Sequence, residues 1–250
     1  MRLDAATVLL QWAGGGLFWG WWTLRTGEVS GGYARLVRGT FGVVAAGACV
    51  AGLTIHAVPA RDAAAALVAL VALAGAVRPS VPVRADLVAV AMALVGCLAA
   101  VADGLGADAD VDAGVVALGM ARVAVGLAFL GLVSDAMLLG HWYLVAPGMP
   151  RRLLNDLVRA LMVVWPLEVA LLFWPPGMLE VLTGAIDDGW GGVLGWFWAA
   201  FAALTGVLAL VARAALRERN YSAVMAATGL TYLTILTGFG TDLIARALLA

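Results

Sequence analysis

Eight long apolar segments divide this 250-residue chain. Most are close to the ~17–25 residues that a helix needs to cross ~30 Å of hydrocarbon. Their apolar residues run continuously instead of alternating, which predicts helices and not the strands of a membrane barrel. Hydrophobic residues make up 64% of the chain and charged residues 12%, whereas soluble domains are roughly 25% charged. The sequence therefore predicts an all-α integral membrane protein, a bundle of about eight transmembrane helices forming a single domain over residues 1–250. The segments are residues 7–24, 40–58, 63–77, 87–102, 113–139, 157–174, 191–212 and 223–248.

The positive charges predict how this bundle is oriented. All fifteen are arginines, and eleven of them lie in four loops that alternate with loops poor in arginine or rich in aspartate. Arginine-rich loops stay in the cytoplasm. We therefore expect both termini on the outer, non-cytoplasmic side of the cell (inner) membrane, which agrees with an even number of spans. The eleven are Arg25, Arg35, Arg38, Arg78, Arg84, Arg151, Arg152, Arg159, Arg213, Arg217 and Arg219.

Several classes of chemistry are excluded by what the sequence lacks. Without lysine the chain can form neither a Schiff base nor a Walker-type phosphate site. It contains no GxSxG or HExxH motif. A net charge of −1 gives no basic field for nucleic acid, and Cys49 and Cys97 stand isolated in apolar runs as packing residues. Short loops leave no soluble catalytic domain, so the sequence favours a subunit over a stand-alone enzyme.

The two histidines lie at opposite faces of the predicted membrane. His56 ends the second segment on the outer side, and His141 ends the fifth on the inner side. About 30 Å of bilayer would separate them. We therefore expect no haem ligated by both histidines and no metal site, although ligation of a haem by one histidine alone stays open.

Three segments place a charged residue in one layer of the predicted outer leaflet. At 1.5 Å per residue, Arg122 lies about 13 Å from the outer helix end, and Glu168 and Asp242 lie about 9 Å from theirs. Charges within the hydrocarbon are rare and usually functional. With His56 just above them, these residues are our candidates for a substrate or proton-relay site.

Two interpretations of this layer stay open. Arg122 with Glu168, and Asp242 with Arg246 at i,i+4 spacing, could form ion pairs that only hold helices together. Alternatively, the layer is a polar pocket that opens outward and contains a carboxylate able to exchange protons, and a quinone is the cofactor compatible with it.

A second group of residues falls at the predicted cytoplasmic boundary. The helix from residue 113 is long enough to project from the membrane, and aromatic residues at its end precede two arginines. We predict contact with a partner chain or a lipid headgroup there, the alternative being side chains that merely reach the interface. The candidates are Asp135, His141, Trp142, Tyr143, Arg151 and Arg152.

Three functions fit these observations. The first is an integral membrane subunit of a larger complex, respiratory or redox in kind, with an outer-leaflet quinone or proton-relay pocket; its partners would be the lipid bilayer and other membrane subunits. The second is a transporter or channel for a small solute or ion that uses the same charges, although the absence of an internal repeat counts against it. The third is a structural or assembly protein without chemistry of its own.

Overall fold

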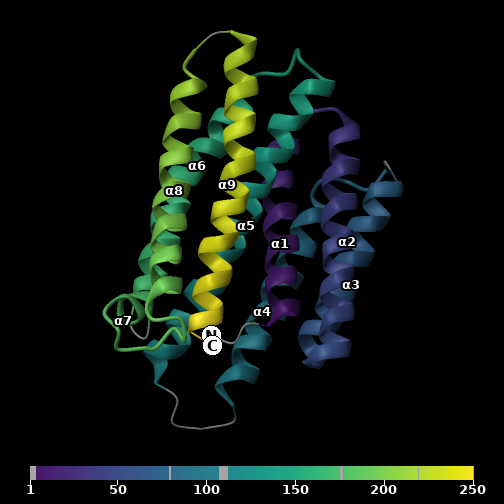
Figure 1. Cartoon of the computed structure of the whole chain (residues 1–250). Helices are drawn as coiled ribbons and strands as arrows, with labels where there is room; N and C mark the ends of the chain where they lie inside the picture. Colours follow the sequence, from purple (N-terminus) through teal and green to yellow (C-terminus); the bar gives the residue numbers. More distant parts are fainter. Residues whose placement is uncertain (1–3, 79, 107–111, 175–176, 219, 250) are drawn as a thin grey trace.

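The computed structural model describes residues 4–78, 80–106, 112–174, 177–218 and 220–249, which form helices and no strands (Figure 1). Arg219, one of the predicted cytoplasmic charges, lies outside the described residues. The two termini lie at the same end of the bundle (Figure 1). The described helices are α1 (Ala5–Leu24), α2 (Gly31–Ile55), α3 (Pro59–Val77), α4 (Ala85–Leu105), α5 (Ala113–Val145), α6 (Arg152–Phe173), α7 (Met178–Leu182), α8 (Val193–Ala215) and α9 (Tyr221–Leu248).

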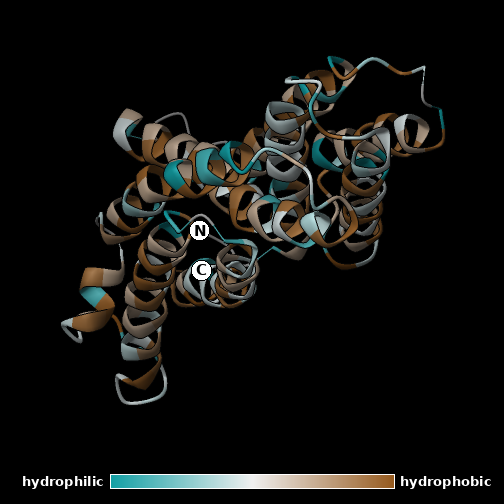
Figure 2. Cartoon of the chain, turned by 90° about the horizontal axis from the view of Figure 1, so that it is seen from above, coloured by the Kyte–Doolittle hydropathy of each residue, from teal (hydrophilic) through white to brown (hydrophobic). Residues whose placement is uncertain are grey.

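Six of the described helices are long and apolar enough to cross a membrane: α2, α3, α4, α5, α8 and α9. Their outward faces carry exposed residues such as Leu53, Leu70 and Val95, and hydrophobic colouring covers much of the outside of the bundle (Figure 2). The chain is a multi-pass membrane protein. Helices α1 and α6 are of similar length but are not among these six; α1 contains Gln11 and three consecutive glycines, and α6 contains four charged residues.

The helices extend beyond the apolar segments that predict them. α3 and α4 have 19 and 21 residues, so neither is short. α2 begins at Gly31, which places Arg35 and Arg38 inside a helix and not in a loop. Capping residues explain several of these starts: the side chains of Asp112 and Asn220 accept backbone N–H bonds at α5 and α9, and proline begins α3.

Helix α1 runs through the centre of the bundle and contacts α2, α4 and α5. Its glycines allow this position. A Cβ atom on Gly15 would overlap the backbone carbonyl of Leu127, and one on Gly131 would overlap Gly15. Small residues on facing helices let the backbones approach closely, which is how helices pack in lipid.

The remaining helices lie on either side of the α1–α5 contact. α2, α3 and α4 pack on one side, and α6, α8 and α9 on the other. One large buried cluster contains residues from both sides, among them Phe41, Ala93, Phe129, Leu157 and Val224. The two sides therefore share a core, and side chains from α1, α5, α6 and α9 can meet within it.

Candidate functional site

The centre of the candidate site is a buried ion pair on α9. Nε of Arg246 lies 2.7 Å from Oδ2 of Asp242, and only 4% and 0% of the two side chains are exposed. The residues stand one turn apart, so both side chains extend from the same face of the helix. The predicted i,i+4 pair is confirmed.

Glu168 of α6 joins this pair. Its carboxyl group is buried, and the side chains that act on it electrostatically are Asp242, Arg246 and Arg122. The structure thus brings together the three charges that the depth argument placed in one layer.

The site has polar atoms whose hydrogen bonds are not all made. Among the described residues, Oε2 of Glu168, Oδ1 of Asp242 and Nη2 of Arg246 are buried without a hydrogen-bond partner. Leaving a buried polar group unsatisfied costs about 1–3 kcal/mol. Three such atoms in one place indicate an arrangement that is suited to holding a proton or a polar ligand and is not optimised as an ion pair alone.

Arg122 also binds the backbone at the end of α6. Its Nε donates to the carbonyl oxygen of Leu171 at 3.1 Å, and its Nη2 donates to that of Trp174 at 2.9 Å. These carbonyls belong to the end of α6, where backbone acceptors lack partners within the helix and a positive charge is favourable. Arg122 therefore caps α6, with Glu168 as an electrostatic neighbour.

Gln11 belongs to the site and was missed by the sequence interpretation. It is fully buried in α1, and its Nε2 donates to the carbonyl oxygen of Val123 at 3.0 Å. Gly126 makes room for it, because a Cβ atom there would lie 3.1 Å from Gln11 Nε2 and 3.4 Å from Arg246 Nη2. The available signal was its position, as the one amide side chain in the first apolar segment.

His56 lies apart from the buried charges, at the entrance of the cavity that leads to them. Its ring is half exposed and its Nε2 lies 3.3 Å from Oδ2 of Asp103. A cavity of about 240 Å³ is bordered by His56 and Asp103 and also by Arg122 and Arg246. Of the four predicted site residues, three converge and the fourth stands at the cavity rim.

A network around Arg61 forms the wall beside this rim. Arg61 is buried at the start of α3 and forms ion pairs with Asp62, at 2.8 Å, and with Asp4. Asp4 also caps α1 and lines the cavity. Arg61 lies before the apolar segment, which begins at residue 63, so hydropathy alone does not place it in a helix.

The predicted contact residues at the other end of the bundle separate into buried and exposed groups. Asp135 is fully buried, with the Tyr33 hydroxyl and the Gly20 N–H as its nearest polar groups, although neither reaches ordinary hydrogen-bond geometry. Tyr143 is also buried and donates to the carbonyl oxygen of Pro150 at 2.6 Å. Asp135 and Tyr143 are therefore not on the surface that a partner or lipid would touch.

The other four candidates reach that surface at least in part. His141 is exposed and its Nδ1 lies 3.0 Å from the Tyr232 hydroxyl. Arg151 donates to the carbonyl oxygen of Glu218 at 2.9 Å, and exposed Arg152 forms an ion pair with Glu28. Trp142 is half-buried, its ring centroid 5.8 Å from that of Tyr33.

No protein-family model, curated protein or solved structure matches this chain. Within the described residues there is also no group of three or more His, Cys, Asp or Glu side chains placed to hold a metal ion. We therefore infer the function from the geometry of the site.

Proposed function

We propose that this chain is a proton-relaying membrane subunit of a larger complex, respiratory or redox in kind. The observation that supports this proposal is a buried carboxyl pair, Glu168 and Asp242, beside Arg246. Arg246 and Arg122 line a cavity that also has His56 and Asp103 in its wall. A carboxyl group can accept and release protons, and the unsatisfied oxygens of the pair leave it free to do so.

The orientation we propose has eight membrane spans, with α1 and α6 crossing beside the six more apolar helices. The loops after α1, α3, α5 and α8 contain or adjoin the arginine groups, and they lie at the opposite end of the bundle from the termini (Figure 1). The positive-inside rule then places the termini, His56 and the cavity entrance on the outer side of the cell membrane.

A subunit fits this arrangement better than a stand-alone enzyme. The described helices pack as one bundle, and the connections between the long helices are short apart from the segment that contains α7. A redox reaction would need electron carriers, which we assign to partner subunits in the same membrane.

Infrared titration of the purified protein in lipid nanodiscs tests the proposal. We expect a carboxyl band that changes reversibly with the pH of the bulk solution, and we expect Glu168→Gln or Asp242→Asn to abolish it. Glu180→Gln is the matched control, because Glu180 lies on α7 and outside the buried cluster. A band that persists in both site variants, combined with lowered melting temperatures, would show that the cluster only holds helices together.

One observation favours ion conduction as a second candidate. Five buried threonines follow one stripe of α9 away from Asp242: Thr228, Thr231, Thr234, Thr237 and Thr241. Each hydroxyl donates to a carbonyl of its own helix, but its oxygen lone pairs can still face a cation. Flux of H⁺ or Na⁺ into liposomes containing the protein alone, abolished by Asp242→Asn, would favour this function over a subunit role.

A further inference from the structure

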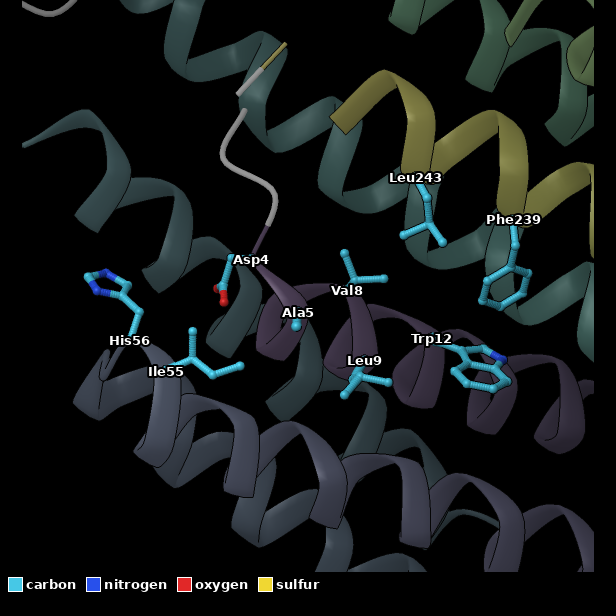
Figure 3. Close-up of a pocket in the computed structure, with 9 residues that line it drawn as sticks. All are labelled: Asp4, Ala5, Val8, Leu9, Trp12, Ile55, His56, Phe239 and Leu243. Carbon is cyan, nitrogen blue, oxygen red and sulfur yellow. The ribbon is translucent and has the colours of Figure 1, made fainter. Parts of the chain in front are cut away.

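A lateral groove lies between α1, α2 and α9, on the outer face of α1 (Figure 3). Its volume is about 660 Å³, within the ~300–1,000 Å³ typical of small-molecule sites. Most of its surface is apolar, and its polar side chains are Asp4 and His56, both at the same end (Figure 3). The apolar walls are Val8, Leu9, Trp12, Ile55, Phe239 and Leu243.

The groove has the dimensions and walls of a site for an apolar chain. From Asp4 to Trp12 it follows two turns of α1, about 12 Å. Trp12 and Phe239 lie at the far end, with ring centroids 5.0 Å apart in an edge-to-face arrangement. The indole N–H of Trp12 donates to the hydroxyl of Ser134 at 2.8 Å, away from the groove. Trp12 therefore presents only apolar atoms to the groove.

The charges at the polar end indicate a neutral head group. Asp4 and Asp103 contribute negative charge there, and the positive charge of Arg61 is already paired with Asp4 and Asp62. A phosphate head group would meet like charge without a free cation to compensate it. A head with carbonyl or hydroxyl groups can instead exchange hydrogen bonds with the His56 ring, which both donates and accepts.

The groove and the inner cavity meet at this end. Asp4 and His56 border both, and the inner cavity continues to Arg122 and Arg246. A ligand whose head group is held at the junction would have its tail among apolar side chains and its polar atoms beside the cavity that contains Arg246, the ion-pair partner of Asp242.

We infer that the lateral groove binds a membrane quinone or quinol, with the isoprenoid tail along α1 and the head group between Asp4 and His56. This inference rests on the proposed function, since it identifies the molecule whose protons the cavity would exchange. The binding itself needs no electron transfer by this chain.

Binding of decylubiquinone to the purified protein in nanodiscs tests the inference. Leu9→Trp fills the groove, and we expect it to weaken binding by about tenfold or more, because small changes of shape in an apolar pocket have effects of this size. Leu70→Trp is the matched control, since Leu70 is an exposed leucine on α3, away from the groove, and it should bind as the unmodified chain does. His56→Ala should weaken decylubiquinone binding while leaving the melting temperature unchanged.

Competition distinguishes a quinone site from a general lipid surface. Phosphatidylglycerol added in excess should not displace decylubiquinone; displacement by it, or equal binding to Leu9→Trp and the unmodified chain, would overturn the inference. Glu168→Gln separates the two proposals, because it should abolish the infrared titration and leave decylubiquinone bound. Titration without binding would therefore refute only the quinone site, whereas binding without titration would refute only the proton relay.

Discussion

Among the buried arginine–aspartate pairs of the described residues, Arg38–Asp86 and Arg246–Asp242 differ in how completely their hydrogen bonds are satisfied. Nε of Arg38 on α2 lies 2.8 Å from Oδ1 of Asp86 on α4, and its other guanidinium nitrogens donate to the carbonyl oxygens of Gly75, Val81 and Pro82. At the other end of the bundle, Nη2 of Arg246 has no partner among the described residues.

This difference is the reason why we propose a structural role for Arg38–Asp86 and a functional role for Arg246–Asp242. Arg38 connects α2, α3 and α4 with every nitrogen engaged, so its neighbourhood has no capacity left for a ligand. Arg246 stands beside two carboxyl groups, each with an unsatisfied oxygen, next to a cavity. We therefore base the proposed site on buried charge combined with unused hydrogen-bonding capacity and a neighbouring cavity, and not on buried charge alone.

The largest effect is expected at the satisfied pair. Arg38→Met leaves Asp86 buried without its partner, and breaking a buried pair in this way costs about 3–5 kcal/mol. Glu168→Gln should cost only about 1 kcal/mol or less, because the carboxyl oxygen that it replaces makes no hydrogen bond. Thermal and denaturant unfolding in detergent would measure both.

A double variant provides the control for that prediction. Arg38→Met combined with Asp86→Leu removes both charges and should recover most of the lost stability, since apolar replacement of a whole buried pair is often neutral. A loss for Arg38→Met no larger than that for Glu168→Gln would remove the distinction between the two pairs.

From the sequence we considered the Asp242–Arg246 pair and missed the Arg38–Asp86 pair. Arg122, Glu168 and Asp242 lie well inside apolar segments, so counting residues from the helix ends was enough to place them at one depth. Arg38 and Asp86 lie just outside the apolar segments at residues 40–58 and 87–102, and Arg38 was assigned to a loop, because hydropathy marks the hydrocarbon core and not the ends of the helices. The partners of Arg38 are distant in sequence, and only the packing of α2, α3 and α4 brings them together.

The same limit explains the other differences. The capping role of Arg122 depends on where α6 ends, and helix ends are weakly encoded in an apolar run. Gln11 and Arg246 come together because α1 and α5 pack closely through Gly15 and Gly131. The periodicity of apolar residues in the sequence does not predict this contact. Hydropathy predicted the membrane class and the helical segments, because both follow from composition over many residues.

Two glycines provide a smaller and more closely matched comparison. A Cβ atom on Gly75 would lie 3.0 Å from Cδ of Arg38, and one on Gly126 would lie 3.4 Å from Nη2 of Arg246. Arg38 is held by four hydrogen bonds and cannot shift, so Gly75→Ala should cost about 1–3 kcal/mol. The nearest atom to a Cβ on Gly126 is Nε2 of Gln11, at 3.1 Å. Gly126→Ala should be close to neutral, because Gln11 Nε2 is held by one hydrogen bond and Arg246 Nη2 by none, and alanine stabilises a helix by about 0.5–1 kcal/mol relative to glycine.

Melting temperatures of the two alanine variants, measured side by side, test whether the packing around Arg246 is more adaptable than the packing around Arg38. Equal losses would contradict the comparison, and so would a larger loss for Gly126→Ala. The reversed result would mean that the packing around Arg246 is as closely fixed as that around Arg38.

The smallest effect concerns the carboxylate of Asp188, which accepts several hydrogen bonds and lies outside the membrane-spanning helices. Asp188 precedes α8 and accepts backbone N–H bonds from Trp190, Gly192, Leu194 and Gly195 at 2.8–3.3 Å. These bonds hold the pKa of the Asp188 carboxyl below its usual range, the bond from Gly192 contributing most. A lowered pKa in the folded state means that the stabilisation is complete above the unfolded-state pKa, about 3.9, and is lost as the pH falls through the folded-state value.

Hydrogen exchange in the loop before α8 should therefore become faster only in acid. In Asp188→Asn this acid-dependent increase should disappear. Hydrogen exchange of residues 183–192 as a function of pH would measure it, with Asp187→Asn as the control because Asp187 accepts only the Gly189 N–H. If acid loosened the Asp188→Asn loop as much as the unmodified one, the carboxylate would not be what holds this turn. The satisfied Asp188 carboxylate in this loop should stabilise the fold less than the satisfied Arg38–Asp86 pair inside the bundle, because desolvation within the bundle strengthens each hydrogen bond that is made.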